Sequence, residues 1–220
     1  MFKKPFGLEQ LHLFIFSLLR LHFAPMKIAK AKHKNIYCIE GNWTHDLRDK
    51  RSIKTGLEFL EHNSFSKKHV LHIHRQCSSL PEFENLLKES VFKKYERYSI
   101  IYLAFHGHEG ILQVGKRATI SIDAIADMLQ GKAQNKIIHF GSCETLKVKK
   151  PQLNRFLKNT GALAVSGYEK SIDFMPSTFL DLLYFQFCQQ YQKMYLVEQD
   201  VKQYYGKLAR ELGFRLIFEK

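Results

Sequence analysis

Residues 99–114 read SIIYLAFHGHEGILQV, and this stretch decides the fold. Residues 99–105 are apolar without the alternation of a half-exposed strand, which is typical of a strand buried on both faces of a parallel sheet. The run ends at two histidines, one on each side of a glycine. A second apolar run, KIIHFGSC at residues 136–143, ends at a cysteine. The sequence therefore predicts two buried strands that each end in a chemically reactive side chain.

Apolar runs and helical spacings alternate along the rest of the chain. Further strands are predicted at residues 35–41, 69–74, 162–168 and 214–218, with a short hairpin arm at 111–114. Helices are predicted at residues 50–63, 80–95, 121–130 and 151–159, from residue 176, and near 197–212. Strands that alternate with helices favour parallel crossovers. We therefore expect a three-layer α/β/α sandwich with a mostly parallel central sheet.

Composition and cysteine usage are those of an ordinary globular protein. The 220 residues are 45% hydrophobic and 25% charged. The four cysteines are widely spaced and form no CxxC pair: Cys38, Cys77, Cys143 and Cys188. This pattern argues against a zinc ribbon or a disulfide framework, and it predicts free thiols in a reducing, cytoplasmic compartment.

Residues 1–25 resemble a signal peptide, with two lysines followed by an apolar run. Arg20 interrupts that run, no small-x-small cleavage site follows, and the run is too short to span a bilayer. We expect an appendage, either a surface helix or an over-long start with Met26 as the true first residue. Residues 26–220 are then a single domain with no membrane partner.

The net charge of +13 invites a nucleic-acid reading. Residues 1–35, however, carry seven Lys and Arg against one acid, and the remaining excess is scattered without a basic stripe. A solvated basic surface is the expected explanation, and a nucleic-acid binder is the minor alternative.

The two reactive strand ends could meet, because ligands of open parallel sheets bind at the carboxyl ends of the strands. On adjacent strands, His106 or His108 would stand beside Cys143. A cysteine attacks as the thiolate, and an imidazole can take its proton and later protonate a leaving group. The N–H groups of Gly107 and Cys143 could together hold a tetrahedral oxyanion.

The motifs SIIYLAFHGHEGIL and KIIHFGSC resemble those of the caspase-like cysteine peptidases, the group of legumains, gingipains, separases and metacaspases. The resemblance covers residues of about 100–200, with a looser strand–helix match from residue 35. It implies a caspase-like domain that acts on protein or peptide substrates without a cofactor. By motif position, His106 is the catalytic histidine, Cys143 the nucleophile and Gly107 the oxyanion-hole glycine. His108 would be a neighbour on the substrate side.

Three departures from caspases bear on specificity. Gly141 stands where caspases have glutamine, and no arginine follows the strand at 162–168, so cleavage after aspartate is not expected. Glu169 or Asp173 in that loop would instead favour a substrate Lys or Arg, as in basic-specific members of the group. Asp173 could equally cap the following helix. No long linker follows the cysteine, so activation by inter-subunit cleavage is not implied.

Other residues near the strand ends have alternative readings. Glu40 and Trp43 follow the first strand and could line the substrate cleft, and Glu40 could also orient the site. His72 and His74 share one strand face, as zinc ligands often do, but a metal site is not the expected reading. His139 is interpreted as a packed core residue.

The two dyad residues could also have purely structural roles. Cys143 could be a core thiol, and His106 could cap strand-end carbonyls. If so, the protein would be a catalytically weak or inactive caspase-fold module that serves in interaction or signalling. The aromatic-rich stretch 179–197 is most simply a core helix, but it could be the face of a homodimer or of a regulatory partner.

Overall fold

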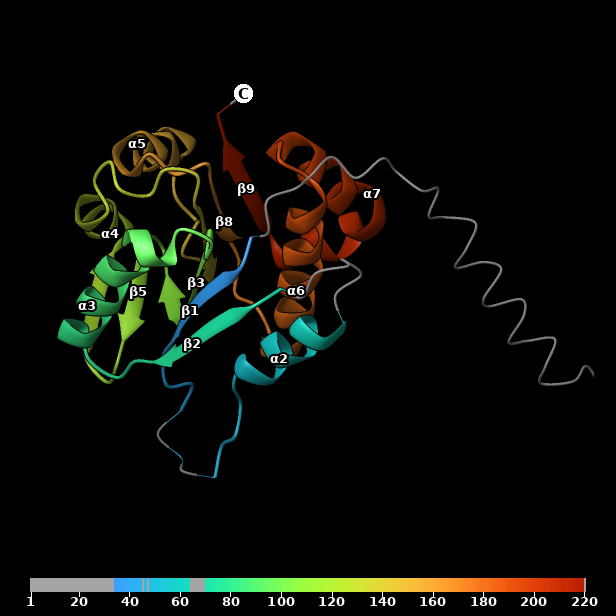
Figure 1. The fold of residues 1–220 in the computed structure, drawn as a ribbon. Coiled ribbons are helices and arrows are strands. Elements are labelled where there is room, and N and C mark those ends of the chain that lie inside the picture. Colours follow the sequence, from blue (N-terminus) through green and yellow to red (C-terminus); the bar gives the residue numbers. More distant parts are fainter. Residues whose placement is uncertain (1–33, 45, 47, 64–69, 220) are drawn as a thin grey trace, which may run out of the picture. The chain divides into compact units, whose positions relative to one another are not determined.

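A computed structural model describes residues 34–219 of the chain, apart from residues 45, 47 and 64–69. These residues form a mixed α/β structure with a mostly parallel six-stranded central sheet and six α-helices (Figure 1). The predicted appendage at residues 1–25 and the alternative start at Met26 lie outside the described residues. No helix within the described ranges is long and apolar enough to cross a membrane.

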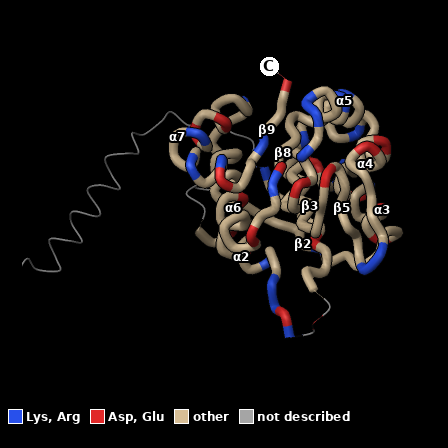
Figure 2. Tube along the Cα trace, turned by 180° about the vertical axis from the view of Figure 1, so that it is seen from behind, with Lys and Arg blue, Asp and Glu red and all other residues tan. Residues whose placement is uncertain are grey.

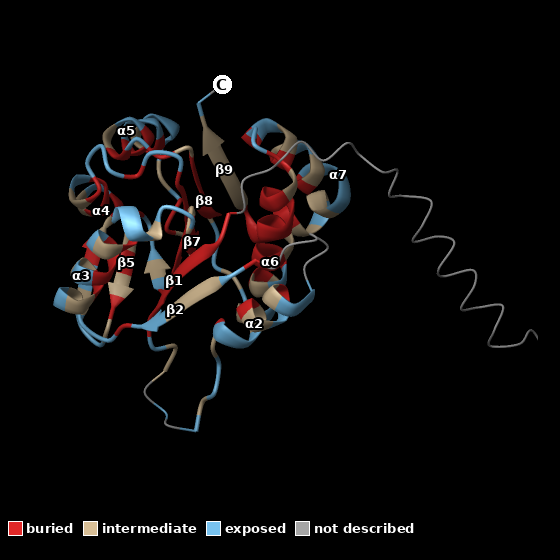
Figure 3. Cartoon of the chain, viewed as in Figure 1, coloured by how far each residue is buried: buried red, intermediate tan, exposed pale blue. Residues whose placement is uncertain are grey.

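The central sheet has the strand order β2–β1–β3–β7–β8–β9, and every neighbouring pair is parallel except β8 and β9. Its strands are β1 (Ile36–Glu40), β2 (His72–Gln76), β3 (Ile100–Ala104), β7 (Ile137–Gly141), β8 (Ala164–Tyr168) and β9 (Phe214–Phe218). Strands β1, β3, β7 and β8 are buried along their whole length (Figure 3). Burial on both faces explains why their sequences do not alternate.

The helices form a layer on each face of the sheet. They are α2 (Lys54–Asn63), α3 (Leu80–Ser90), α4 (Ile122–Met128), α5 (Lys150–Thr160), α6 (Phe174–Gln190) and α7 (Met194–Leu212). Successive strand residues point to opposite faces. Ile101 of β3 therefore packs in the core with α3, α4 and α5, whereas Tyr102 packs in the core with α2, α6 and α7. The three-layer prediction is confirmed.

A small antiparallel sheet branches from the end of β3. It consists of β4 (His106–His108), β5 (Ile111–Val114) and β6 (Ala118–Ser121). The hairpin arm at 111–114 was predicted, but β4 and β6 were not. Ser121 then begins α4 as expected, and its Oγ accepts a hydrogen bond from the Ala124 N–H at 3.1 Å.

Several predicted boundaries differ from the observed ones, and two helix ends differ by four residues or more. The helix predicted from residue 50 begins only at Lys54, directly after Ile53, whose N–H donates to the Glu40 carboxylate. The helix predicted over 80–95 ends at Ser90 and is followed by the 3-10 turn η1 (Lys93–Tyr95).

Basic and acidic residues are interspersed on the described part of the chain. Figure 2 shows Lys and Arg among Asp and Glu on α7 and on the segment that leads into α2. The solvated basic surface and the absence of a nucleic-acid partner stay predictions.

Candidate active site

The strands β3 and β7 are neighbours, so their two reactive ends lie at the same edge of the sheet. Ala104 pairs with Gly141 in parallel register. His106 and Cys143 each lie two residues beyond this pair. The adjacency that the sequence could only assume is thus a property of the fold.

The glycine after His106 packs directly on the main chain of the cysteine. A Cβ added to Gly107 would lie 2.8 Å from the Cys143 carbonyl oxygen and still closer to Thr145 Oγ1. The Thr145 hydroxyl is in turn 3.3 Å from that carbonyl and 2.7 Å from Ser142 Oγ. Strand β4 therefore approaches the cysteine as closely as it does only because residue 107 has no side chain.

Cys143 lies in a tight turn at the end of β7. The next residue, Glu144, has a φ of 53°, which is uncommon for a residue with a side chain. The Glu144 N–H donates to Lys170 O at 3.0 Å, whereas the Cys143 N–H donates no hydrogen bond within the described residues. The turn therefore leaves one main-chain donor beside the sulfur free for a ligand.

The cysteine sulfur contacts the loop between β8 and α6. Ile172 N–H donates to Cys143 Sγ at 3.4 Å, and Ser171 Oγ lies 4.0 Å from it. Ile172 O is 3.6 Å from the same sulfur and can accept the thiol proton. Across the described ranges no hydrogen bond joins Sγ to the His106 ring, so the thiol proton is not already directed at the imidazole.

Cys143 is the accessible thiol of the described chain. Cys38, Cys77 and Cys188 are buried, whereas Cys143 is partly exposed. Burial raises the pKa of Cys77 to about 11 and that of Cys188 to about 12, and it raises the pKa of Cys38 well above the ordinary value. A core-thiol role thus suits the other three cysteines better than Cys143.

His106 is exposed and held by the main chain of Trp43. Its Nε2 lies 2.7 Å from Trp43 O. A carbonyl oxygen only accepts, so the hydrogen must be on Nε2, and Nδ1 of the neutral ring carries the lone pair. The Trp43 indole also packs edge-on against the imidazole, with ring centroids 5.5 Å apart.

Glu40 is not a substrate contact, because its side chain is fully buried. Four donors surround its carboxylate: Trp43 Nε1 (2.6 Å), Ser52 Oγ (2.7 Å), Ile53 N (2.7 Å) and His74 Nε2 (2.6 Å). Burial by itself would raise the pKa of Glu40, but these hydrogen bonds together hold it below its ordinary value. The expectation that Glu40 lines the cleft was therefore wrong. Its buried contacts agree with the alternative expectation, that Glu40 orients other residues of the site.

The other predicted substrate-binding residues differ in whether their side chains already have a partner. His108 is exposed on β4. Glu169 is paired with Arg215, whose Nε lies 3.6 Å from its carboxylate. Asp173 is exposed at the N-terminus of α6, but its side chain makes no capping hydrogen bond. Asp173 follows Ile172, which touches the sulfur, so its carboxylate is the better placed of the two acids.

The strand histidines face carboxylates. His74 contacts Glu40, and His72 Nδ1 lies 2.5 Å from Glu61 Oε2. Among the residues that the structure describes, no three His, Cys, Asp or Glu side chains converge as metal ligands would.

A buried polar cluster behind the site was not predicted. His139 is packed as expected, but its ring nitrogens also lie 2.8 Å from Ser166 Oγ and 2.8 Å from Asp181 Oδ1. Asp181 further accepts hydrogen bonds from the hydroxyls of Tyr102 and Tyr168. A single acid within the apolar stretch FLDLLYFQF was the sequence signal for it.

One family model matches residues 33–218, and its description is a family of unknown function (DUF6642). None of the curated proteins matches the chain. The matched range includes every site residue described above.

Proposed function

The chain belongs to DUF6642, a family of unknown function, and from its site we propose that it is a caspase-like cysteine endopeptidase with a His106–Cys143 dyad. The observation that carries the proposal is the pairing of β3 with β7, which brings an exposed imidazole and a partly exposed thiol to one sheet edge. The contact of Gly107 with the Cys143 main chain agrees with the HisGly…Cys resemblance of the sequence.

The proposed reaction is acyl transfer. His106 Nδ1 takes the thiol proton, and Cys143 Sγ attacks the peptide carbonyl carbon. The oxyanion is held by the free Cys143 N–H and by the Gly107 N–H. His106 then protonates the departing amine as the C–N bond breaks, leaving a thioester. Water attacks the thioester, gives one proton to His106, and the acid product leaves as that proton returns to the sulfur.

Asp173 supports cleavage after basic residues. Asp173 is exposed, its carboxylate makes no hydrogen bond or ion pair within the described residues, and it directly follows Ile172. A Lys or Arg side chain of a protein or peptide substrate would complement it. Glu169 is the weaker candidate because Arg215 already pairs with it.

The alternative is a catalytically weak caspase-fold module that binds a regulatory partner or a second copy of itself. One observation favours it: the sulfur is hydrogen-bonded to Ile172 and not, within the described residues, to His106. In that case a bound partner would have to bring the Cys143 thiol and the His106 ring into contact, or the two groups would never react together.

Selective alkylation tests the proposal. A peptidyl electrophile with Lys at its recognition position is offered to the wild type and to His106→Ala near neutral pH, and mass spectrometry reads all four cysteines. We expect rapid modification of Cys143 that is lost in His106→Ala. The matched control is His62→Ala, which removes an exposed imidazole at the end of α2. Equal, slow labelling in all three proteins would refute the dyad and favour the module.

A probe with Asp in place of Lys tests specificity in the same assay. The wild type should prefer the Lys probe, and Asp173→Asn should lose that preference without losing reaction at Cys143. An unchanged preference in Asp173→Asn would remove Asp173 from the pocket.

A further inference from the structure

The Glu40 carboxylate ties down both ends of the segment that precedes α2. Trp43 Nε1 donates to Oε1 at the start of the segment, and Ile53 N–H donates to the same oxygen at its end. Ser52 Oγ donates to Oε2 at 2.7 Å. The ion pairs Asp46–Arg48 and Asp49–Arg51 of this segment join residues only two positions apart. The buried carboxylate therefore joins both ends of the segment to β1.

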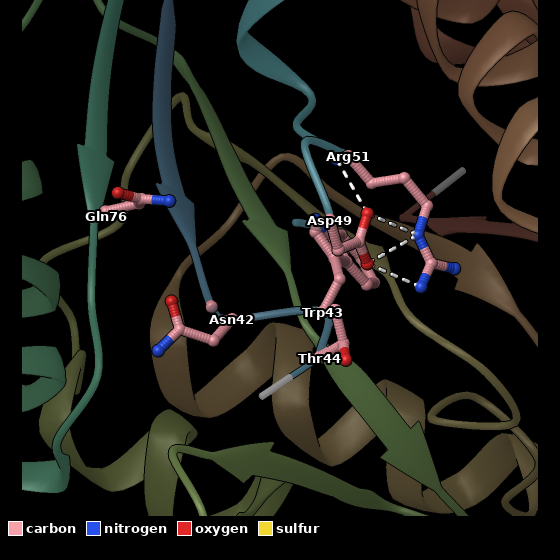
Figure 4. A pocket seen from close by; sticks show the side chains of 7 residues that line it. Asn42, Trp43, Thr44, Asp49, Arg51 and Gln76 are labelled. Atoms are coloured by element: carbon pink, nitrogen blue, oxygen red, sulfur yellow. Dashed lines mark hydrogen bonds and ion pairs between the residues drawn. The ribbon is translucent and has the colours of Figure 1, made fainter. Parts of the chain in front are cut away.

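Trp43 connects this anchor to His106. Its indole N–H is 2.6 Å from Glu40 Oε1, and its carbonyl oxygen is 2.7 Å from His106 Nε2. Its ring packs edge-on against His106 and, at 5.1 Å between centroids, against Phe174 of α6. Figure 4 shows Trp43 in the wall of a small pocket, between Asn42 and Thr44 and beside the Asp49–Arg51 pair. The residue that positions the imidazole is thus itself positioned by a fully buried acid.

We infer that Glu40 is a positioning residue for the proposed reaction: it fixes Trp43 so that the Trp43 carbonyl holds His106 in the Nε2–H tautomer. Neutral imidazole has two tautomers, and only the one with a free Nδ1 lone pair leaves that nitrogen as a base. A carbonyl at hydrogen-bond distance from Nε2 selects this tautomer. Without the carboxylate, the buried Ile53 N–H and three partly buried side-chain donors lose their common acceptor, and Trp43 is no longer held in place by its indole. The catalytic part of this inference rests on the proposed function, whereas the positioning of Trp43 and His106 by Glu40 does not.

The tautomer can be read without any activity. Long-range ¹H–¹⁵N spectra of the full chain distinguish Nε2–H from Nδ1–H imidazoles, and the His106 signals are those missing from His106→Ala. We expect an Nε2–H ring in the wild type and a mixture of both tautomers in Glu40→Gln. Glu61→Gln is the matched control. Glu61 contacts His72, which lies on β2 as does His74, the partner of Glu40, and this variant should keep the wild-type spectrum.

Alkylation kinetics supply the second readout. In Glu40→Gln the maximal inactivation rate at Cys143 should fall by about 10- to 100-fold, the effect of a misplaced catalytic group, while the concentration for half-maximal rate stays unchanged. A merely structural role would not separate these two quantities. If Glu40→Gln fails to fold, Trp43→Phe replaces it, since it removes the indole N–H and keeps an aromatic ring on His106.

The failures of the inference and of the proposed function are distinguishable. An Nε2–H ring and a wild-type inactivation rate in Glu40→Gln, or in Trp43→Phe where that variant replaces it, would overturn the inference and leave the peptidase proposal intact. A wild type that does not react at Cys143 would overturn the peptidase proposal. A mixed tautomer in Glu40→Gln would then still support the positioning of His106 by Glu40.

Discussion

Replacing Gly107 by alanine tests the closest contact of the candidate site. The new Cβ would lie 2.8 Å from the Cys143 carbonyl oxygen and 3.1 Å from the Ile111 carbonyl oxygen, whereas ordinary contacts begin at 3.4 Å. Thr145 Oγ1 is nearer still, but a side chain can move more easily than a main chain. The alanine must therefore push the Cys143 backbone away by about half an ångström, on the scale at which overpacked cores relax.

Two magnitudes follow from this displacement. Overpacking of this kind lowers the free energy of unfolding by about 1 to 3 kcal/mol. Catalytic groups have to be held within about 0.5 Å of the productive geometry, so alkylation of Cys143 by the Lys probe should slow by about tenfold or more. Urea unfolding measures the first quantity, and timed mass spectrometry of Cys143 measures the second.

The double variant Gly107→Ala/Thr145→Ala separates the two contacts. It removes the nearest obstructing atom, so the stability cost of Gly107→Ala should be smaller in the Thr145→Ala background. The labelling defect should remain, because the carbonyl contact is unchanged. Wild-type stability and wild-type labelling in Gly107→Ala would show that β4 does not press on the cysteine, and the reasoning about this site would be refuted.

Three further predictions concern buried groups. Asp181→Leu leaves His139 Nε2 and the Tyr102 hydroxyl without their acceptor, and leaves the Tyr168 hydroxyl only Ser177 O. This substitution should lower the free energy of unfolding in urea by about 3 to 5 kcal/mol, and a loss below about 1 kcal/mol would contradict the cluster. Because the pKa of Glu40 is lowered in the fold, its ionised form stabilises the protein at neutral pH and that contribution is lost as the pH falls through the folded-state pKa. In urea, the free energy of unfolding of Glu40→Gln should be about 2 to 3 kcal/mol below that of the wild type at neutral pH, and this difference should become smaller in acid. A difference that does not change with pH would show that it arises from packing and not from the charge of Glu40. In native protein an exposed-thiol reagent should modify Cys143 quickly and the other three cysteines only after denaturation, and two fast thiols would contradict the burial described here.

Much of the fold was predictable because local patterns report burial. Unbroken apolar runs located β3, β7 and β8, and the capping residue Ser121 located the start of α4. The predicted three-layer arrangement and mostly parallel sheet are confirmed. Strand β6 was missed because ATIS at residues 118–121 is too short to show a period.

The residues of the site were less predictable than its motifs. Glu40 was expected to line the cleft or to orient the site because it stands at the end of the first strand, and the sequence does not reveal that donors as distant as His74 surround it. Trp43 was noted, but the role of its carbonyl depends on a contact 63 residues along the chain. Ile172 carries no polar side chain, so its hydrogen bond to the sulfur leaves no trace in the sequence.

The amino-acid sequence by itself determined the order of the central-sheet strands and of the helices, and the two motifs that end in His106 and Cys143, since both depend on neighbours within a few residues. Only the tertiary structure decided that β3 lies beside β7, that Glu40 is buried, and that Trp43 O meets His106 Nε2. These are choices among pairings of distant segments, and each is made by the packing of the whole core and not by any local preference.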